Sequence, residues 1–305
     1  MCRCGPLAFR APCFLLAVLV VAASILLASC GQGSSTNRSL SFTTIDMPGY
    51  TYTVPYKINA SGEIVGAYFD TLAIQHGFLW QAGSFTTVVV PGAVDNDLEG
   101  INDSTMTTGA YDDTNGLTHG FLRQPNGSVV TIDPPASAGY AQAEGINNSG
   151  TIVGLFFGNT GSQGFQFSNG KYTTINLPGA SGTSLYAINN VGDTVGIYTD
   201  ASGVSHGFLM SNGSVTTLDF PGATSTNAQG INDNGDIVGS AVVANVRHGY
   251  LYSNGNFTQI DFPGASPAGS GGPLTGTDVH GINASGVIVG SYSDSAGIVH
   301  GFIAR

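Results

Sequence analysis

Six polar side chains occupy one repeated position of this 305-residue chain, each three residues before an Asn that follows Ile. They are Tyr56, Glu99, Glu144, Tyr186, Gln229 and His280. Their neighbours are small or apolar by comparison, such as Leu98, Ala143 and Val279. A position that varies while staying polar is typical of a binding site carried on a repeated scaffold. The alternative is that these side chains only satisfy backbone groups between repeats.

The acidic members of this set suggest one possible reaction. Glu99 and Glu144 belong to adjacent repeats and could act as acid and base on a glycosidic bond, with His280 nearby. Their separation does not follow from the sequence, and a fold alone never establishes chemistry. The chain has no G-x-S-x-G elbow, no phosphate-binding loop and no Cys/His metal pattern. We therefore predict a binding module without cofactor, metal or catalytic residue, and keep a glycan hydrolase or lyase as the alternative.

Two other groups of residues resemble metal sites. The first comprises five His at one repeated position, His76, His119, His206, His248 and His300. If each repeat is one blade of a β-propeller, this position falls on the third strand of the blade, about 10 Å outward from the wall of the central channel. Zinc needs ligands at about 2 Å, so the five side chains would be too far apart to share one ion. We expect each His to hydrogen-bond a turn of its own repeat instead. The second group is the acidic run 232–236, which lacks the Glu of a calcium loop and is predicted to be a turn.

The repeat itself predicts the architecture. The Asn of the Ile-Asn pair falls at 59, 102, 147, 189, 232 and 283, in steps of 43, 45, 42, 43 and 51 residues. A period near forty, rich in Gly and β-branched residues, indicates an all-β, six-bladed β-propeller. One repeat divides into short runs at 97–102, 107–112, 119–123 and 128–133, which fit four antiparallel strands per blade joined by Asn-Gly and Asp-Gly type turns. The Ile-Asn strands should line the central channel.

The two ends of residues 41–305 complement each other. The last repeat stops at Arg305 with three strands and no fourth. Residues 41–49 form a complete fourth-strand phrase before any first strand. We expect residues 41–49 to pair near Phe302, complete the last blade and close the ring, which leaves no exposed sheet edge.

The phrases G-I-N, I-V-G and H-G-F over residues 42–305 resemble the HAF-type extracellular repeat family. The resemblance implies a surface or secreted repeat protein without an assigned biochemical role. The chain departs from the pattern at Gln163, where the His is absent, and over residues 240–245.

The N-terminus indicates export. Residues 1–29 read as a signal peptide, with Arg3 and Arg10 before an apolar run. Leu27-Ala-Ser-Cys30 resembles a bacterial lipobox, which implies lipidation of Cys30, a flexible tether over residues 30–40 and a location at the outer membrane or cell surface. An uncleaved anchor or a plain secretory signal are the alternatives. All four cysteines lie at or before position 30, so no disulfide is expected in the propeller.

Composition limits the partners. Eight basic residues stand against 19 acidic ones, which argues against nucleic acid. A monomer that binds a small molecule, a glycan or an envelope protein fits better, and a purely structural envelope protein is the remaining alternative. The extra residues 266–277 would form either a flap over the channel mouth or a disposable loop.

Overall fold

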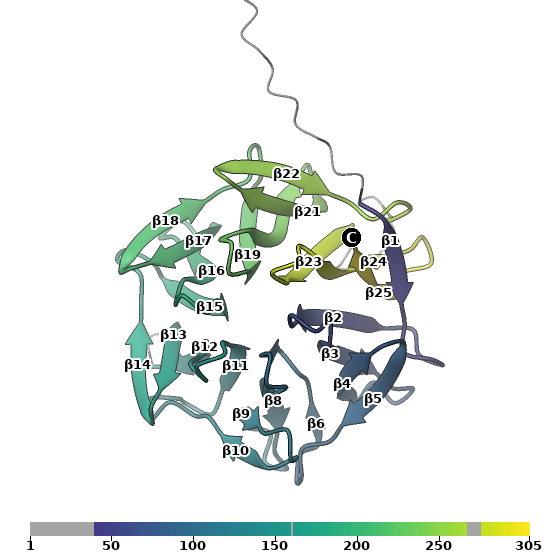
Figure 1. Cartoon of the computed structure of the whole chain (residues 1–305). Coiled ribbons are helices and arrows are strands. Elements are labelled where there is room, and N and C mark those ends of the chain that lie inside the picture. The colour runs from purple at the N-terminus through teal and green to yellow at the C-terminus, as the bar shows by residue number, and fades with distance from the viewer. Residues whose placement is uncertain (1–39, 160, 267–275) are drawn as a thin grey trace, which may run out of the picture. The chain divides into compact units, whose positions relative to one another are not determined.

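The computed structural model describes residues 40–159, 161–266 and 276–305, and these form six antiparallel sheets around a central axis (Figure 1). This is a six-bladed β-propeller, as the sequence predicts. The described ranges contain no helix, and hence none that could cross a membrane. The signal peptide 1–29, Cys30, the tether up to residue 39 and most of the insertion 266–277 lie outside the described residues.

Each blade runs from an inner strand at the channel to an outer strand at the rim. Blade 1 consists of β2 (Thr53–Ile58), β3 (Ile64–Phe69), β4 (Gln75–Gln81) and β5 (Ser84–Val88). Blade 2 consists of β6 (Asp95–Asn96), β7 (Gly100–Ile101), β8 (Thr107–Asp112), β9 (Thr118–Arg123) and β10 (Val129–Thr131). Blade 3 consists of β11 (Ala141–Ile146), β12 (Ile152–Gly158), β13 (Gly161–Ser168) and β14 (Lys171–Ile175).

The remaining blades follow the same order. Blade 4 consists of β15 (Gly182–Ile188), β16 (Thr194–Thr199), β17 (Ser205–Ser211) and β18 (Ser214–Leu218). Blade 5 consists of β19 (Ser225–Ile231), β20 (Ile237–Val243), β21 (Val246–Ser253) and β22 (Asn256–Ile260). Blade 6 consists of β23 (Thr277–Ile282), β24 (Ile288–Ser293), β25 (Val299–Ala304) and the N-terminal β1 (Phe42–Ile45).

The closure of the ring is as predicted. Strand β1 pairs antiparallel with β25, with Phe42 opposite Ala304 and Thr44 opposite Phe302 (Figure 1). The pairing continues one residue further, because the backbones of Ser41 and Arg305 exchange hydrogen bonds of 2.8 and 3.0 Å. The N-terminal strand therefore supplies the outer edge of the blade that the C-terminus begins.

The His-Gly-Phe and Ile-Val-Gly phrases recur because they build the core. The aromatic residue of each His-Gly-Phe unit or its variant is fully buried, at positions 78, 121, 165, 208, 250 and 302. In blade 1, Gly66 pairs with Phe78, and a Cβ on Gly66 would lie 2.8 Å from the Phe78 ring. Hydrophobic clusters join neighbouring blades, as where Val65 packs with Leu98 and Phe121. Burial of each such ring stabilises the fold by about 1.5–3 kcal/mol.

Candidate functional site

A β-bulge marks the variable polar position in five of the six blades. The pairing register between the first and second strands shifts around Tyr56, Glu144, Tyr186, Gln229 and His280, each of which is the extra residue. In blade 2 the inner strand is interrupted between β6 and β7, and Glu99 lies in the gap. A bulge locally breaks the in-out alternation and re-aims a side chain. The repeated irregularity therefore directs this residue of each blade toward the channel.

All six predicted residues line one cavity of about 180 Å³, together with Lys57 and Asn227. We call this the mouth cavity. The six residues that share one repeated position in the sequence therefore lie together in space, and their role as a binding site stays a prediction. Of the six, Glu144 and His280 are buried and the other four are half-buried.

One side of the mouth cavity is acidic. The carboxyl groups of Glu99 and Glu144 lie within hydrogen-bonding reach of each other, and Asp97 lies within the same reach of Glu99. Burial raises the pKa of Glu99 well above its usual range and the pKa of Glu144 to about 7. Burial likewise raises the pKa of Asp97. Because burial raises the pKa of all three acids, this side carries less negative charge near pH 7 than three free carboxyl groups would.

The opposite side holds a neutral histidine. Gln229 Oε1 lies 2.7 Å from His280 Nδ1, and His280 Nε2 lies 3.2 Å from the hydroxyl of Ser291. Burial lowers the pKa of His280 to about 4. Because the Gln229 amide also donates to Asp278 at 3.0 Å, its oxygen faces the histidine and Nδ1 carries the proton. Asp278 is in turn paired with Arg247.

Two tyrosines complete the wall between these sides. Tyr56 packs edge-on against His280, with ring centroids 5.5 Å apart. Burial, with the nearby carboxyl groups second, raises the pKa of both Tyr56 and Tyr186. Both hydroxyls therefore stay protonated at neutral pH and can donate hydrogen bonds.

The sequence analysis missed two members of the mouth cavity, Asn227 and Lys57, and Lys57 is the charged one. The equivalent positions are Gly100, Gly145, Ala187, Gly230 and Gly281. Lys57 also lines the next cavity along the channel, of about 70 Å³, so it lies at the boundary between the two. Burial lowers its pKa, against the opposing effect of Glu99 and Glu144. A single basic residue at a position otherwise occupied by Gly or Ala was the signal that could have revealed it.

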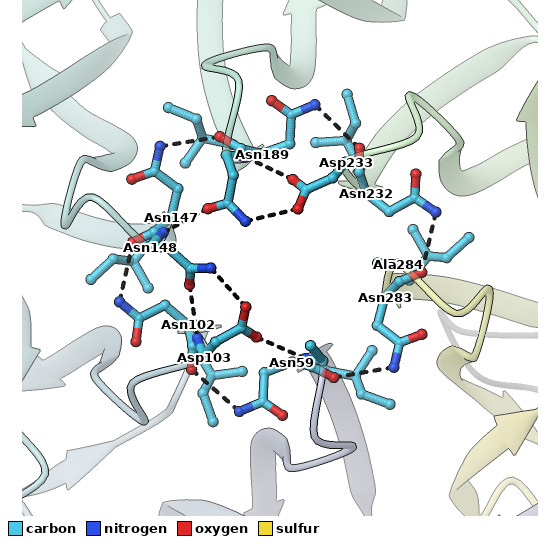
Figure 2. Close-up of a pocket in the computed structure, with 18 residues that line it drawn as sticks. Asn59, Asn102, Asp103, Asn147, Asn148, Asn189, Asn232, Asp233, Asn283 and Ala284 are labelled. Atoms are coloured by element: carbon cyan, nitrogen blue, oxygen red, sulfur yellow. Dashed lines mark hydrogen bonds between the residues drawn. The ribbon is translucent and has the colours of Figure 1, made fainter.

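The other end of the channel has a different construction. The side-chain amide of each Ile-Asn residue donates to the main-chain carbonyl of the Asn in the next blade, at 3.1–3.2 Å (Figure 2). We call this closed circle the asparagine ring; its members are Asn59, Asn102, Asn147, Asn189, Asn232 and Asn283. The ring surrounds a cavity of about 90 Å³. Each Asn side-chain amide hydrogen-bonds the next blade, so the asparagine ring stabilises the propeller at this end of the channel.

The repeated histidines contact aspartates within their own blades. His76 lies 3.0 Å from Asp70 in the hairpin before it, while His206 lies 2.9 Å from Asp219 at the end of the outer strand. His119, His248 and His300 make the corresponding contacts to Asp133, Asp261 and Asp46. The expected local hydrogen bonding is confirmed, with the correction that the closest partner is more often the outer-strand Asp than the turn. The predicted turn at 232–236 is also confirmed, because Asn232 Oδ1 accepts from the backbone amides of Asn234 and Asp236.

A second cavity adjoins the acidic side of the mouth. It measures about 190 Å³ and lies between blades 2 and 3, lined by Asp95, Asp97, Asp112, Tyr111, Tyr140, Gln142 and their neighbours. Asp97 lines this cavity and contacts Glu99 of the mouth cavity. The charges of Asp97 in this cavity and Glu99 in the mouth cavity therefore act on each other.

Comparison with known proteins supports the fold. No protein-family model matches the chain, and no curated protein matches it in sequence. Among solved structures, the lectin of Aleuria aurantia is similar with a TM-score of 0.52 and 12% identity over 83% of this chain and 92% of the lectin. A putative gluconolactonase gives a TM-score of 0.50 and 12% identity over 88% of this chain and 92% of that chain. AofleA from Arthrobotrys oligospora gives a TM-score of 0.50 and 13% identity over 85% of this chain and 80% of that chain. At such identities the likeness shows the propeller fold alone.

Proposed function

We propose that the protein is an extracytoplasmic ligand-binding module whose site is the mouth cavity, and that its ligand is one unit of a glycan. The observation that carries this proposal is the convergence on one cavity of six variable polar residues, five at bulges and one at a strand break, in a scaffold that otherwise repeats. Structural positions of the repeat keep their residue type, as the asparagine ring does. A position that holds four different residue types in six blades, with only Tyr and Glu occurring twice, has a purpose other than holding blades together.

The chemistry of the mouth cavity fits a sugar. The cavity of about 180 Å³ has room for several water-sized groups. The amide of Gln229, the hydroxyls of Tyr56 and Tyr186 and the carboxyl groups can donate and accept hydrogen bonds, as sugar hydroxyls require. The tyrosine rings offer apolar faces for the ring carbons. A lectin with this fold, from Aleuria aurantia, is known in complex with a fucosylated sugar, which makes a glycan a reasonable first class to test.

The geometry favours binding over glycoside hydrolysis. The two carboxyl groups of a glycosidase stand about 5–9.5 Å apart, on either side of the bond that they cleave. Glu99 and Glu144 instead lie within hydrogen-bonding reach of each other. A sugar ring does not fit between them, so the pair is better suited to holding one hydroxyl than to acting from two sides.

We further propose that the chain is a member of the HAF-type extracellular repeat family and a lipoprotein. The lipobox-like Leu27-Ala-Ser-Cys30 supports lipidation of Cys30 after removal of residues 1–29. The tether would then hold a monomeric propeller at the outer membrane or cell surface. Metabolic labelling with an alkyne fatty acid tests this directly: wild-type protein should acquire the label and Cys30→Ser should not.

The binding proposal is tested by screening a glycan array with the purified protein. We expect retention of specific glycans, at least tenfold weaker retention for Glu99→Gln and Gln229→Ala, and unchanged retention for Asp103→Asn at the asparagine-ring end. Asp103 is a matched control because an amide oxygen can still accept from the backbone of Ala60. Retention that is independent of the mouth variants would contradict the proposal. Hydrolysis of a bound glycan that Glu144→Gln abolishes would instead establish an enzyme.

A further inference from the structure

Lys57 projects from the most crowded position of the inner strands. At the equivalent Gly281, a Cβ would lie 2.7 Å from the carbonyl of Tyr56 and 3.0 Å from Lys57 Cα. At Gly145, a Cβ would lie 3.0 Å from Ala187 Cα. Neighbouring inner strands therefore approach too closely for side chains at most of these positions. Blade 1 alone has a long side chain there, and it lines the mouth cavity.

The ammonium group of Lys57 has no partner within the described ranges. It forms neither an ion pair nor a side-chain hydrogen bond there, whereas the neighbouring cation Arg247 is paired with Asp278. The charges of Glu99 and Glu144 act on Lys57, but neither carboxyl group forms an ion pair with it. A half-buried cation without a direct ion pair costs stability. A ligand that brings an anionic group would remove this cost.

We propose that Lys57 anchors the carboxylate of an acidic sugar bound in the mouth cavity. This inference rests on the proposed function and narrows its ligand class. The carboxylate lies against Lys57, and the ring hydroxyls meet Gln229, the two tyrosines and the protonated member of the carboxyl pair. Uronic acids are the simplest sugars with this chemistry. His280 does not compete for the anion, since burial keeps it neutral.

The chain offers a direct spectroscopic test, because Lys57 and Lys171 are its only lysines. Reductive methylation with ¹³C-formaldehyde keeps both positive charges and gives each lysine a separate NMR signal. Lys57→Gln and Lys171→Gln variants assign the two signals. Lys171 is exposed on β14 and serves as the internal control. Acetate, D-galacturonate and D-galactose are the probes, and the two sugars differ only in the carboxylate.

We expect acetate and D-galacturonate to shift the Lys57 signal saturably while the Lys171 signal stays in place. By calorimetry on unmodified protein, D-galacturonate should bind at least tenfold more tightly than D-galactose. Lys57→Gln should abolish that preference, Lys57→Arg should retain part of it, and Lys171→Gln should retain all of it. The NMR titration uses the wild-type sequence, so it holds even if a variant folds poorly.

The inference and the proposed function fail in different ways. A Lys57 signal that responds to neither acetate nor D-galacturonate overturns the anchoring role. The anchoring role is also overturned if the protein binds D-galacturonate and D-galactose with equal affinity and Lys57→Gln leaves both affinities unchanged. That result would still leave a glycan site in the mouth cavity. A response of Lys57 to acetate without binding of either sugar keeps the anion site and overturns the glycan proposal on which this inference rests.

Discussion

Glu99 and Glu144 bring their carboxyl groups within hydrogen-bonding reach of each other although they come from different blades. The interruption of the inner strand of blade 2 and the bulge in blade 3 make this approach possible. The pair holds a proton into the neutral pH range because burial disfavours its charge. The mouth cavity consequently changes its charge close to physiological pH.

The affinity for an acidic sugar should fall as pH rises through about 7. Below this pH, Glu144 is largely protonated and the positive charge of Lys57 attracts the ligand carboxylate. Above it, the ionised Glu144 repels that carboxylate. His280, whose pKa is about 4, and the two tyrosines keep their charge over this range. Burial also raises the pKa of Glu99 and Asp97 and lowers that of Lys57, and each of these titrations weakens binding of an anion in the same direction as pH rises. Calorimetry with D-galacturonate from pH 5.5 to 8.5 should show a loss of about three- to tenfold. Glu144→Gln should flatten the profile, and an affinity that rises with pH would contradict this account.

The same carboxyl group should make stability depend on pH. A folded-state pKa of about 7, above that of the unfolded chain, means that the folded protein binds the extra proton. Its contribution is therefore favourable at pH 5 and is lost as pH rises toward 8. We would measure the free energy of unfolding of both proteins with urea at pH 5 and at pH 8. From pH 5 to pH 8, the difference between Glu144→Gln and the wild type should change by about 1–3 kcal/mol in favour of the variant. Parallel pH profiles for the two proteins would mean that Glu144 titrates normally.

Removing the N-terminal strand should open the propeller. Without residues 41–49, β25 becomes an unpaired edge and His300 loses its contact with Asp46. We expect the shortened protein to oligomerise or to melt more than about 10 °C below the wild type. Size-exclusion chromatography and calorimetry measure both effects. A monomer with an unchanged melting temperature would show that closure by β1 contributes little.

A break in the asparagine ring should also be costly. Asn283→Ala removes the 3.1 Å hydrogen bond to the carbonyl of Asn59, which keeps only the backbone amide of Gly62 as a donor, and so breaks the link between blades 6 and 1. It also removes the acceptor for the backbone amides of Ser285 and Val287. We expect a loss of about 2–4 kcal/mol in the free energy of unfolding. Asn115→Ala, in an exposed hairpin, is the control and should cost less than about 1 kcal/mol.

The recurring residues predicted the fold well because each has a purpose within every blade. The buried Phe, the Gly beneath it and the asparagine ring all repeat, so their spacing revealed both blade number and closure. The six mouth residues were identified because they fail to repeat. Lys57 was missed because its position is otherwise Gly or Ala and only one blade departs from that pattern; the structure shows that its side chain reaches the cavity. The contact between Glu99 and Glu144 depends on a broken strand that no local sequence signal marks.

The position of a bound ligand tests the central claim most directly. Crystals of the protein soaked with the glycan that the array retains most strongly should show a sugar unit in the mouth cavity, in contact with Tyr186, Gln229 and Lys57. Density at the asparagine ring or on the outer rim, with the mouth cavity unchanged, would contradict the claim that the six variable polar residues form the binding site.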